Sequence, residues 1–102
     1  MSEDAVRDAS RIVEELVREE KLRQIVVLLY LLHTGHAIEN DLRRAMTGGR
    51  YPVATHVARA VLSDLLDAKL VEMIRVGRYK VYRLTDLGRR VAEELAQRAG
   101  LA

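Results

Sequence analysis

The sequence predicts a mainly α-helical domain with one small β-hairpin, an α+β fold. Residues 3–33 contain no Gly or Pro, and their apolar side chains recur at helical spacing. Over residues 70–84 the spacing between apolar side chains shortens toward two positions, and β-forming side chains dominate. A helical period returns after Thr85 and continues almost to the end of the chain.

Length and composition limit the classes of protein that the chain can represent. With 102 residues it is long enough for one domain with a modest core. It has no Cys, which excludes disulfides and thiolate metal sites. The longest apolar run, residues 25–32, is too short to cross a bilayer and is not placed as a signal peptide would be. We therefore expect a cytoplasmic protein with no membrane segment.

Charge is distributed unevenly along the chain, although the net charge is only +2. Residues 1–20 hold seven acidic side chains against three Arg, a net charge of −4. Residues 43–83 hold nine cationic side chains against three acidic ones, a net charge of +6. A basic middle segment of this kind favours a surface that binds a polyanion. Arginines that merely solvate helix faces would give a similar composition.

The N-terminal segment is expected to form two helices with a bend near Glu20. The first carries a narrow apolar stripe, whereas residues 25–32 are apolar on almost every side, as in a central buried helix. Gly35 is expected to end the second helix as a C-cap residue. A short helix should follow at about residues 38–46.

A longer helix is predicted over residues 52–67, after the break TGGRYP. Pro52 suits its first turn, because an N–H at that position would have no partner within the helix. One face is apolar and would be buried. The opposite face carries short or hydrogen-bonding side chains, namely Thr55, His56, Arg59 and Ser63.

The hairpin is predicted from residues 70–75 and 79–84, with VGR forming the turn between them. Tyr82 should pack inward and hold the root of the hairpin against the core. Thr85 then begins the last helix as its N-cap, and that helix runs to about Arg98.

This order of helix, short helix, longer helix, hairpin and helix is that of a winged helix-turn-helix domain. The stretch LLDAKLVEMIRVGRYKVYRLTDLGRRVAEEL resembles the part of PadR-like and MarR-like transcriptional regulators that runs from the recognition helix to the C-terminal helix. The segment TGGRYPVATHVARAVLSDLLDAKLV is closer to the PadR-like pattern, in which a Gly–Gly–aromatic loop leads into the recognition helix. Resemblance covers residues 22–95, and Tyr–Arg–Leu–Thr–x–x–Gly at residues 82–88 is its most specific part. Both families usually have Gly where this chain has Lys69.

The resemblance implies a regulator, with a repressor expected, that binds double-stranded DNA in a sequence-specific way. The recognition helix would enter the major groove, where base edges can be distinguished. Arg59 is the best candidate for a bidentate contact with guanine, although it could instead pair with Ser63 or Asp64. Arg50, in the preceding loop, would bind phosphate.

The tip of the hairpin, the wing, is expected to contact the DNA backbone or the minor groove. Cations there gain affinity by releasing the counterions condensed on DNA. Phosphate contacts orient a protein only if the loop that makes them is fixed at its root. The wing cations are Arg75, Arg78 and Lys80.

A homodimer is predicted because the N-terminal and the C-terminal helix each carry a narrow apolar stripe. A winged helix core of this size does not need these stripes. We expect residues 1–20 to be a dimerisation helix, residues 21–84 the DNA-binding core, and residues 85–102 a helix that packs in the dimer. An exposed stripe must be buried somewhere. The predicted interface consists of Val6, Ala9, Val13, Leu16, Val17, Val91 and Leu95. The alternative is a first helix that folds back on its own domain.

Other functions have weaker support in the sequence. His33 and His36 are three positions apart, but only Glu39 is an obvious further ligand, so no metal site is expected. There is no Gly-rich phosphate loop and no nucleophile with a paired base, and we expect neither an enzyme nor a cofactor. A winged helix that docks a protein in a larger assembly is the main rival, and an RNA-binding one is the third possibility. Nothing in the sequence identifies a small-molecule effector.

Overall fold

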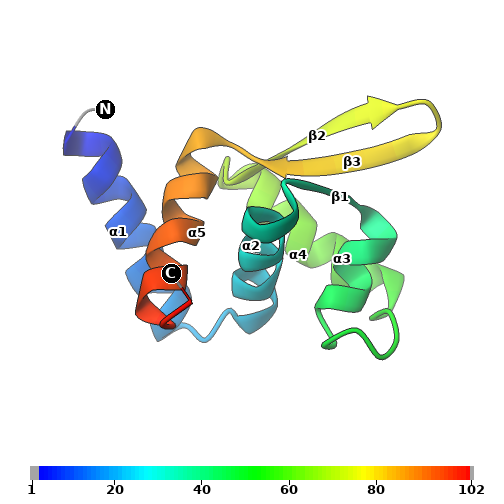
Figure 1. The fold of residues 1–102 in the computed structure, drawn as a ribbon, viewed down its shortest axis with the longest axis horizontal. Coiled ribbons are helices and arrows are strands. Elements are labelled where there is room, and N and C mark those ends of the chain that lie inside the picture. Colours follow the sequence, from blue (N-terminus) through cyan, green and yellow to red (C-terminus); the bar gives the residue numbers. More distant parts are fainter. Residues whose placement is uncertain (1–2, 102) are drawn as a thin grey trace.

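The computed structural model describes the backbone of residues 3–101 and the side chains of residues 7–101. The elements are α1 (Glu3–Arg18), α2 (Leu22–Thr34), β1 (His36–Ile38), α3 (Glu39–Ala45), α4 (Thr55–Asp67), β2 (Val71–Val76), β3 (Tyr79–Leu84) and α5 (Asp86–Arg98) (Figure 1). The predicted α+β class is confirmed. Over residues 3–101, every helix lacks the length or the apolar character that crossing a bilayer needs.

The predicted bend near Glu20 separates α1 from α2. Glu20 has a φ of 54°, in the left-handed region. The Lys21 N–H donates to the Leu16 carbonyl at 3.0 Å, which closes the end of α1. Gly35 ends α2 as predicted, with a φ of 84° and an N–H that donates to the Leu31 carbonyl at 2.8 Å.

The hairpin belongs to a three-stranded antiparallel sheet in the order β1-β3-β2. The third strand, β1, was not predicted, because a strand of three residues is too short to show a period of two. Its Ala37 pairs with Tyr82 in the middle of β3. Through this pairing, the start of α3 is fixed to the root of the hairpin.

One apolar cluster runs through all the helices and the root of the hairpin. Tyr82 is only 5% exposed and belongs to this cluster, which confirms its predicted place in the core. Leu28, Leu62 and Leu65 connect the central helix α2 with α4 in the same cluster. Helix α4 and the hairpin therefore pack on a single core.

The apolar stripe of α1 lies against its own chain, where α1 packs on α5 and α2 (Figure 1). This corrects the expectation that the core of the same chain does not use this stripe. The contact that we predicted to form across a twofold axis is made between α1 and α5 of one chain. The buried members of the predicted dimer interface are Ala9, Val13, Leu16, Val91 and Leu95. Val17 is 47% exposed, and the side chain of Val6 lies outside the described residues.

Polar contacts along its edge also attach α1 to α5. Arg98 donates to Glu14 at 2.6 Å, and the Ser10 hydroxyl donates to Glu94 at 2.8 Å. The hydrogen bond from Arg98, together with its charge, lowers the pKa of Glu14 below its usual value. A lowered folded-state pKa means that the Glu14 contact stabilises the fold at neutral pH and is lost as the pH falls through that value.

Helix α4 begins later than predicted, at Thr55 instead of Pro52. The residues before it are held by α3. The Val53 N–H donates to the Arg43 carbonyl at 3.1 Å, and the Arg43 side chain donates back to the Val53 carbonyl at 2.9 Å. These two bonds keep Val53 out of the helix, and Ala54 is the N-cap.

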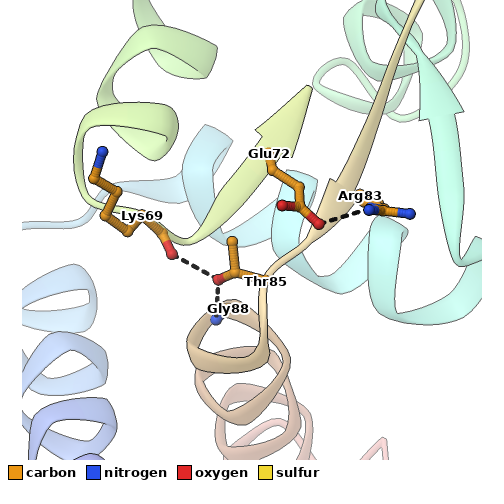
Figure 2. A network of polar contacts seen from close by, with 5 residues as sticks. All are labelled: Lys69, Glu72, Arg83, Thr85 and Gly88. Atoms are coloured by element: carbon orange, nitrogen blue, oxygen red, sulfur yellow. Dashed lines mark hydrogen bonds and ion pairs between the residues drawn. The ribbon is translucent and has the colours of Figure 1, made fainter. Parts of the chain in front are cut away.

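The motif Thr–x–x–Gly joins the last helix to the junction between α4 and β2 (Figure 2). The Thr85 hydroxyl donates to the Lys69 carbonyl at 2.6 Å and accepts the Gly88 N–H at 3.0 Å, the predicted N-cap. The Thr85 N–H donates to the Leu70 carbonyl at 3.1 Å. A Cβ added to Gly88 would lie 1.7 Å from that carbonyl oxygen. Gly88 is therefore required by a close approach of two backbones.

Lys69, where both resembling families usually have Gly, has a left-handed backbone with a φ of 61°. Lys69→Gly should raise the free energy of unfolding by about 0.5–1 kcal/mol, because a side chain in this region is strained and Gly is not. Chemical denaturation measures the change. Ala68→Gly is the matched control, since Ala68 has a φ of −77° and the same replacement there should destabilise the chain. A loss of stability in both variants would contradict this account of Lys69.

Candidate nucleic-acid interface

The outer face of α4 carries the predicted base-reading side chains. The inner face packs through Ala58, Leu62 and Leu65, which are 0%, 2% and 0% exposed. Helical spacing then turns the other face to solvent. On that face His56, Arg59 and Ser63 are exposed, and Thr55 in the first turn is half-buried.

Arg59 has a partner that the sequence did not reveal. Its Nε atom lies 3.7 Å from Oε1 of Glu39, the first residue of α3. The expected alternatives, Ser63 and Asp64, do not pair with it; Asp64 accepts a hydrogen bond from Gln24 at 3.3 Å. Arg59 and Glu39 are far apart in the sequence, and only the packing of α3 against α4 brings them together.

The charges of Glu39 and Arg59 both affect the pKa of Tyr82. Burial raises the pKa of Tyr82, the Glu39 carboxylate raises it further, and the Arg59 guanidinium lowers it. Glu39 directly follows β1, which pairs with β3, and its helix α3 packs on both α4 and β3. This places the ion pair where α3, α4 and β3 meet.

Arg50 lies in the loop between α3 and α4, and hydrogen bonds from Thr47 hold the backbone of this loop. The Thr47 hydroxyl donates to the Arg44 carbonyl at 3.0 Å and also to the carbonyl of Tyr51. Arg50 is exposed, and so is the neighbouring Tyr51 at 64%. Tyr51, an exposed aromatic side chain beside a cation, was not among the predicted site residues. Arg43, by contrast, is half-buried and holds the loop through Val53.

The wing is a tight hairpin with a Gly at its turn. Gly77 has a φ of 61° at the first position of a two-residue loop, where type II′ turns place Gly. Arg75 and Lys80 are directly opposite each other in the ladder, on the same face. Like charges placed opposite each other repel, and a bound polyanion would remove that repulsion. Both side chains, together with Arg78 at the turn, are exposed.

The root of the wing is fixed by an ion pair as well as by Tyr82. Arg83 on β3 donates to Glu72 on β2 at 2.6 Å, across paired positions of the ladder (Figure 2). This contact neutralises Arg83. The uncompensated cations of the hairpin are therefore at its tip, which agrees with the expectation that a phosphate-binding loop needs a rigid root.

The candidate interface lies away from the acidic helix. The hairpin extends beyond the helices at one end of the long axis, and α1 is at the other end (Figure 1). The molecule measures 38 Å along that axis. Exposed charges farther apart than the Debye length, about 8 Å at physiological salt, are largely screened from each other, so charges at the α1 end of the molecule have little influence at the wing tip.

The two histidines considered as metal ligands are both exposed. His33 is in the last turn of α2, and His36 begins β1. Within the described part of the chain, no group of three or more His, Asp or Glu side chains is arranged to hold a metal ion.

Comparison with solved structures identifies the fold as a winged helix. A MarR family transcriptional regulator from Silicibacter pomeroyi is 23% identical, with a TM-score of 0.68 over 91% of this chain and 65% of that one. BpsR of Bordetella bronchiseptica, whose DNA binding is regulated by 6-hydroxynicotinic acid, is 25% identical, with a TM-score of 0.67 over 95% of this chain and 70% of that one. The winged-helix DNA-binding protein F93 from the virus STIV is 19% identical, with a TM-score of 0.59 over 74% of this chain and 84% of that one.

Sequence comparison adds no family assignment, since neither a family model nor a curated protein matches the chain. The structural similarity shows the winged-helix fold, and one of the similar structures is that of a MarR family regulator. The PadR-like resemblance, which rested on the segment TGGRYPVATHVARAVLSDLLDAKLV, is not supported by these structures.

Proposed function

We propose that this protein is a MarR-like transcriptional regulator that binds double-stranded DNA and acts in the cytoplasm. In this proposal α4 lies in the major groove and the wing contacts the backbone or the minor groove. The observation that carries it is a rigidly rooted hairpin whose tip cations, Arg75, Arg78 and Lys80, are exposed and lack acidic partners among the described residues. Similarity to winged-helix DNA-binding proteins supports it.

A winged helix that docks a protein is the main alternative, and the character of α4 argues against it. Protein interfaces are depleted of charge at their centre and enriched in aromatic side chains. The outer face of α4 instead presents Thr55, His56, Arg59 and Ser63. Duplex RNA is a less suitable target, because its major groove is too narrow and deep for a helix to read.

We further propose that the regulator is a homodimer. Two winged helices about 34–36 Å apart would read two half-sites of a palindromic operator, one helical turn apart. Because the stripe of α1 is buried within the chain, a dimer would have to use apolar side chains that remain exposed. Val17 and Leu22, which are 47% and 67% exposed, flank the connection between α1 and α2 and fit this role.

The wing cations provide a direct test of the proposed DNA contact. Arg78→Ala and Lys80→Ala should each weaken binding to all duplexes alike and reduce the slope of log affinity against log salt by about one. Fluorescence anisotropy on a labelled duplex, over a salt series, measures both quantities. Arg18→Ala is the matched control: it removes the same charge from an exposed position in α1, and the slope should not change. Equal effects in all three variants would assign the result to net charge and reject the wing contact.

A further inference from the structure

The ion pair between Glu39 and Arg59 has a geometry that bears on base recognition. Glu39 approaches the Nε atom of the guanidinium, 3.7 Å away, and is its only ion-pair partner among residues 7–101. The Arg59 side chain is 68% exposed and the Glu39 side chain 28%. One edge of the guanidinium therefore faces the protein, and the two terminal nitrogens are left for another acceptor.

Glu39 is the less exposed member of the pair, and its backbone position is fixed by the sheet. It is the first residue of α3, directly after β1, whose pairing with β3 fixes the backbone at that point. A carboxylate in the first turn of a helix is also favoured by the helix dipole. Arg59, in contrast, projects from α4 on a long and flexible side chain. The carboxylate is thus the more constrained member of the pair, and the guanidinium is the member that it can orient.

We propose that Glu39 is a positioning residue that holds Arg59 ready for a bidentate contact with a guanine in the major groove. This inference rests on the proposed DNA-binding function and assigns to it a second residue that governs specificity. A guanidinium held at one edge can present its two terminal N–H groups to the O6 and N7 acceptors of guanine. Pre-orientation reduces the ordering cost of that contact.

The same carboxylate should also disfavour non-specific binding. On random DNA, Arg59 can gain only a phosphate contact, for which no fixed orientation is needed. Glu39 competes with phosphate for the guanidinium, and its charge repels the backbone. Loss of the carboxylate should therefore have opposite effects on preferred and random DNA. A purely structural role for Glu39 would change both in the same direction.

The test begins with the wild-type chain and a pool of duplexes that share a randomised core. Bound duplexes are sequenced, and affinities are then measured for the most enriched duplex and for a scrambled duplex of equal composition. For Glu39→Gln we expect the ratio of these affinities to fall by about three- to tenfold, part of the discrimination that a bidentate arginine–guanine contact provides. Affinity for the scrambled duplex should rise, and the preference for guanine at one position should weaken.

Three further variants separate positioning from charge and from folding. Asp41→Asn removes the same charge from an exposed position in α3, and it should leave the affinity ratio unchanged. Glu39→Asp keeps the charge but shortens the side chain, and it should lower the ratio without tighter binding to scrambled DNA. In an Arg59→Ala background, Glu39→Gln should have no effect on the ratio. Thermal melting of each variant checks that the chain is folded.

The possible outcomes distinguish this inference from the function on which it rests. If the wild-type chain enriches no sequence, the proposed sequence-specific function is overturned and this inference with it. If the wild-type chain selects a sequence but Glu39→Gln and Glu39→Asp keep the wild-type ratio, only the role of Glu39 is overturned. A ratio that falls equally in Asp41→Asn would also reject it, because net charge would then be sufficient.

Discussion

Gly88→Ala should destabilise the fold by about 3 kcal/mol or more, because the added Cβ would lie 1.7 Å from the Leu70 carbonyl oxygen. That oxygen belongs to the backbone and already accepts the Thr85 N–H, so it cannot move aside as a flexible side chain could. For a domain of this size, the loss corresponds to a fall in Tm of about 12–24 °C. Differential scanning calorimetry measures it.

Gly48→Ala is the control for this prediction. Gly48 has a φ of 77°, but a Cβ there would meet nothing within 4 Å, so only the strain of the left-handed backbone remains. That strain costs about 1–2 kcal/mol. If the two variants melted at the same temperature, the close approach at Gly88 would not be the reason for its glycine.

Leu16→Glu should reduce the free energy of unfolding by about 3–5 kcal/mol, since it removes a buried apolar side chain and places a charge at the contact between α1 and α5. Leu16 is 6% exposed within a single chain. Urea denaturation measures the loss. The neighbouring Val17 is 47% exposed within a single chain, and at a protein concentration low enough for the chain to be monomeric, Val17→Glu should change stability by no more than about 0.5 kcal/mol. A similar loss in both variants would contradict the docking of α1 on its own chain.

The same two variants address the proposed dimer. Sedimentation of the wild-type chain at micromolar concentration should show twice the chain mass of 11.6 kDa. Val17→Glu should dissociate that species without unfolding it, and should weaken DNA binding through the loss of bivalency. A wild-type species at the mass of one chain would refute the dimer.

The regular elements of the fold could be predicted because their signals are local. Helical spacing, the cap residues Gly35 and Thr85, and the β-forming run around VGR each act over a few neighbouring residues. The position of Tyr82 in the core could be predicted from the same local patterns. Two features were not predicted. Strand β1 is too short to show a period, and the start of α4 depends on hydrogen bonds between Arg43 and Val53.

The candidate site could be predicted only in part, because its organisation depends on contacts between distant residues. Exposed cations on the wing follow from residue type and from their position around a turn. The pairing of Arg59 with Glu39 and the burial of the α1 stripe depend on how helices pack, which no local pattern encodes. Amphipathic spacing shows that the face of α1 is buried, but not whether its own chain or a partner covers it.

The most direct test of the central claim is the binding of the wild-type chain to double-stranded DNA across a range of salt concentrations. Anisotropy of a labelled duplex should give an affinity that falls steeply, with a slope of several units of log affinity per log unit of salt, as counterion release by the wing and loop cations requires. No binding at low salt, or an affinity that does not change between low and physiological salt, would contradict a DNA-binding function.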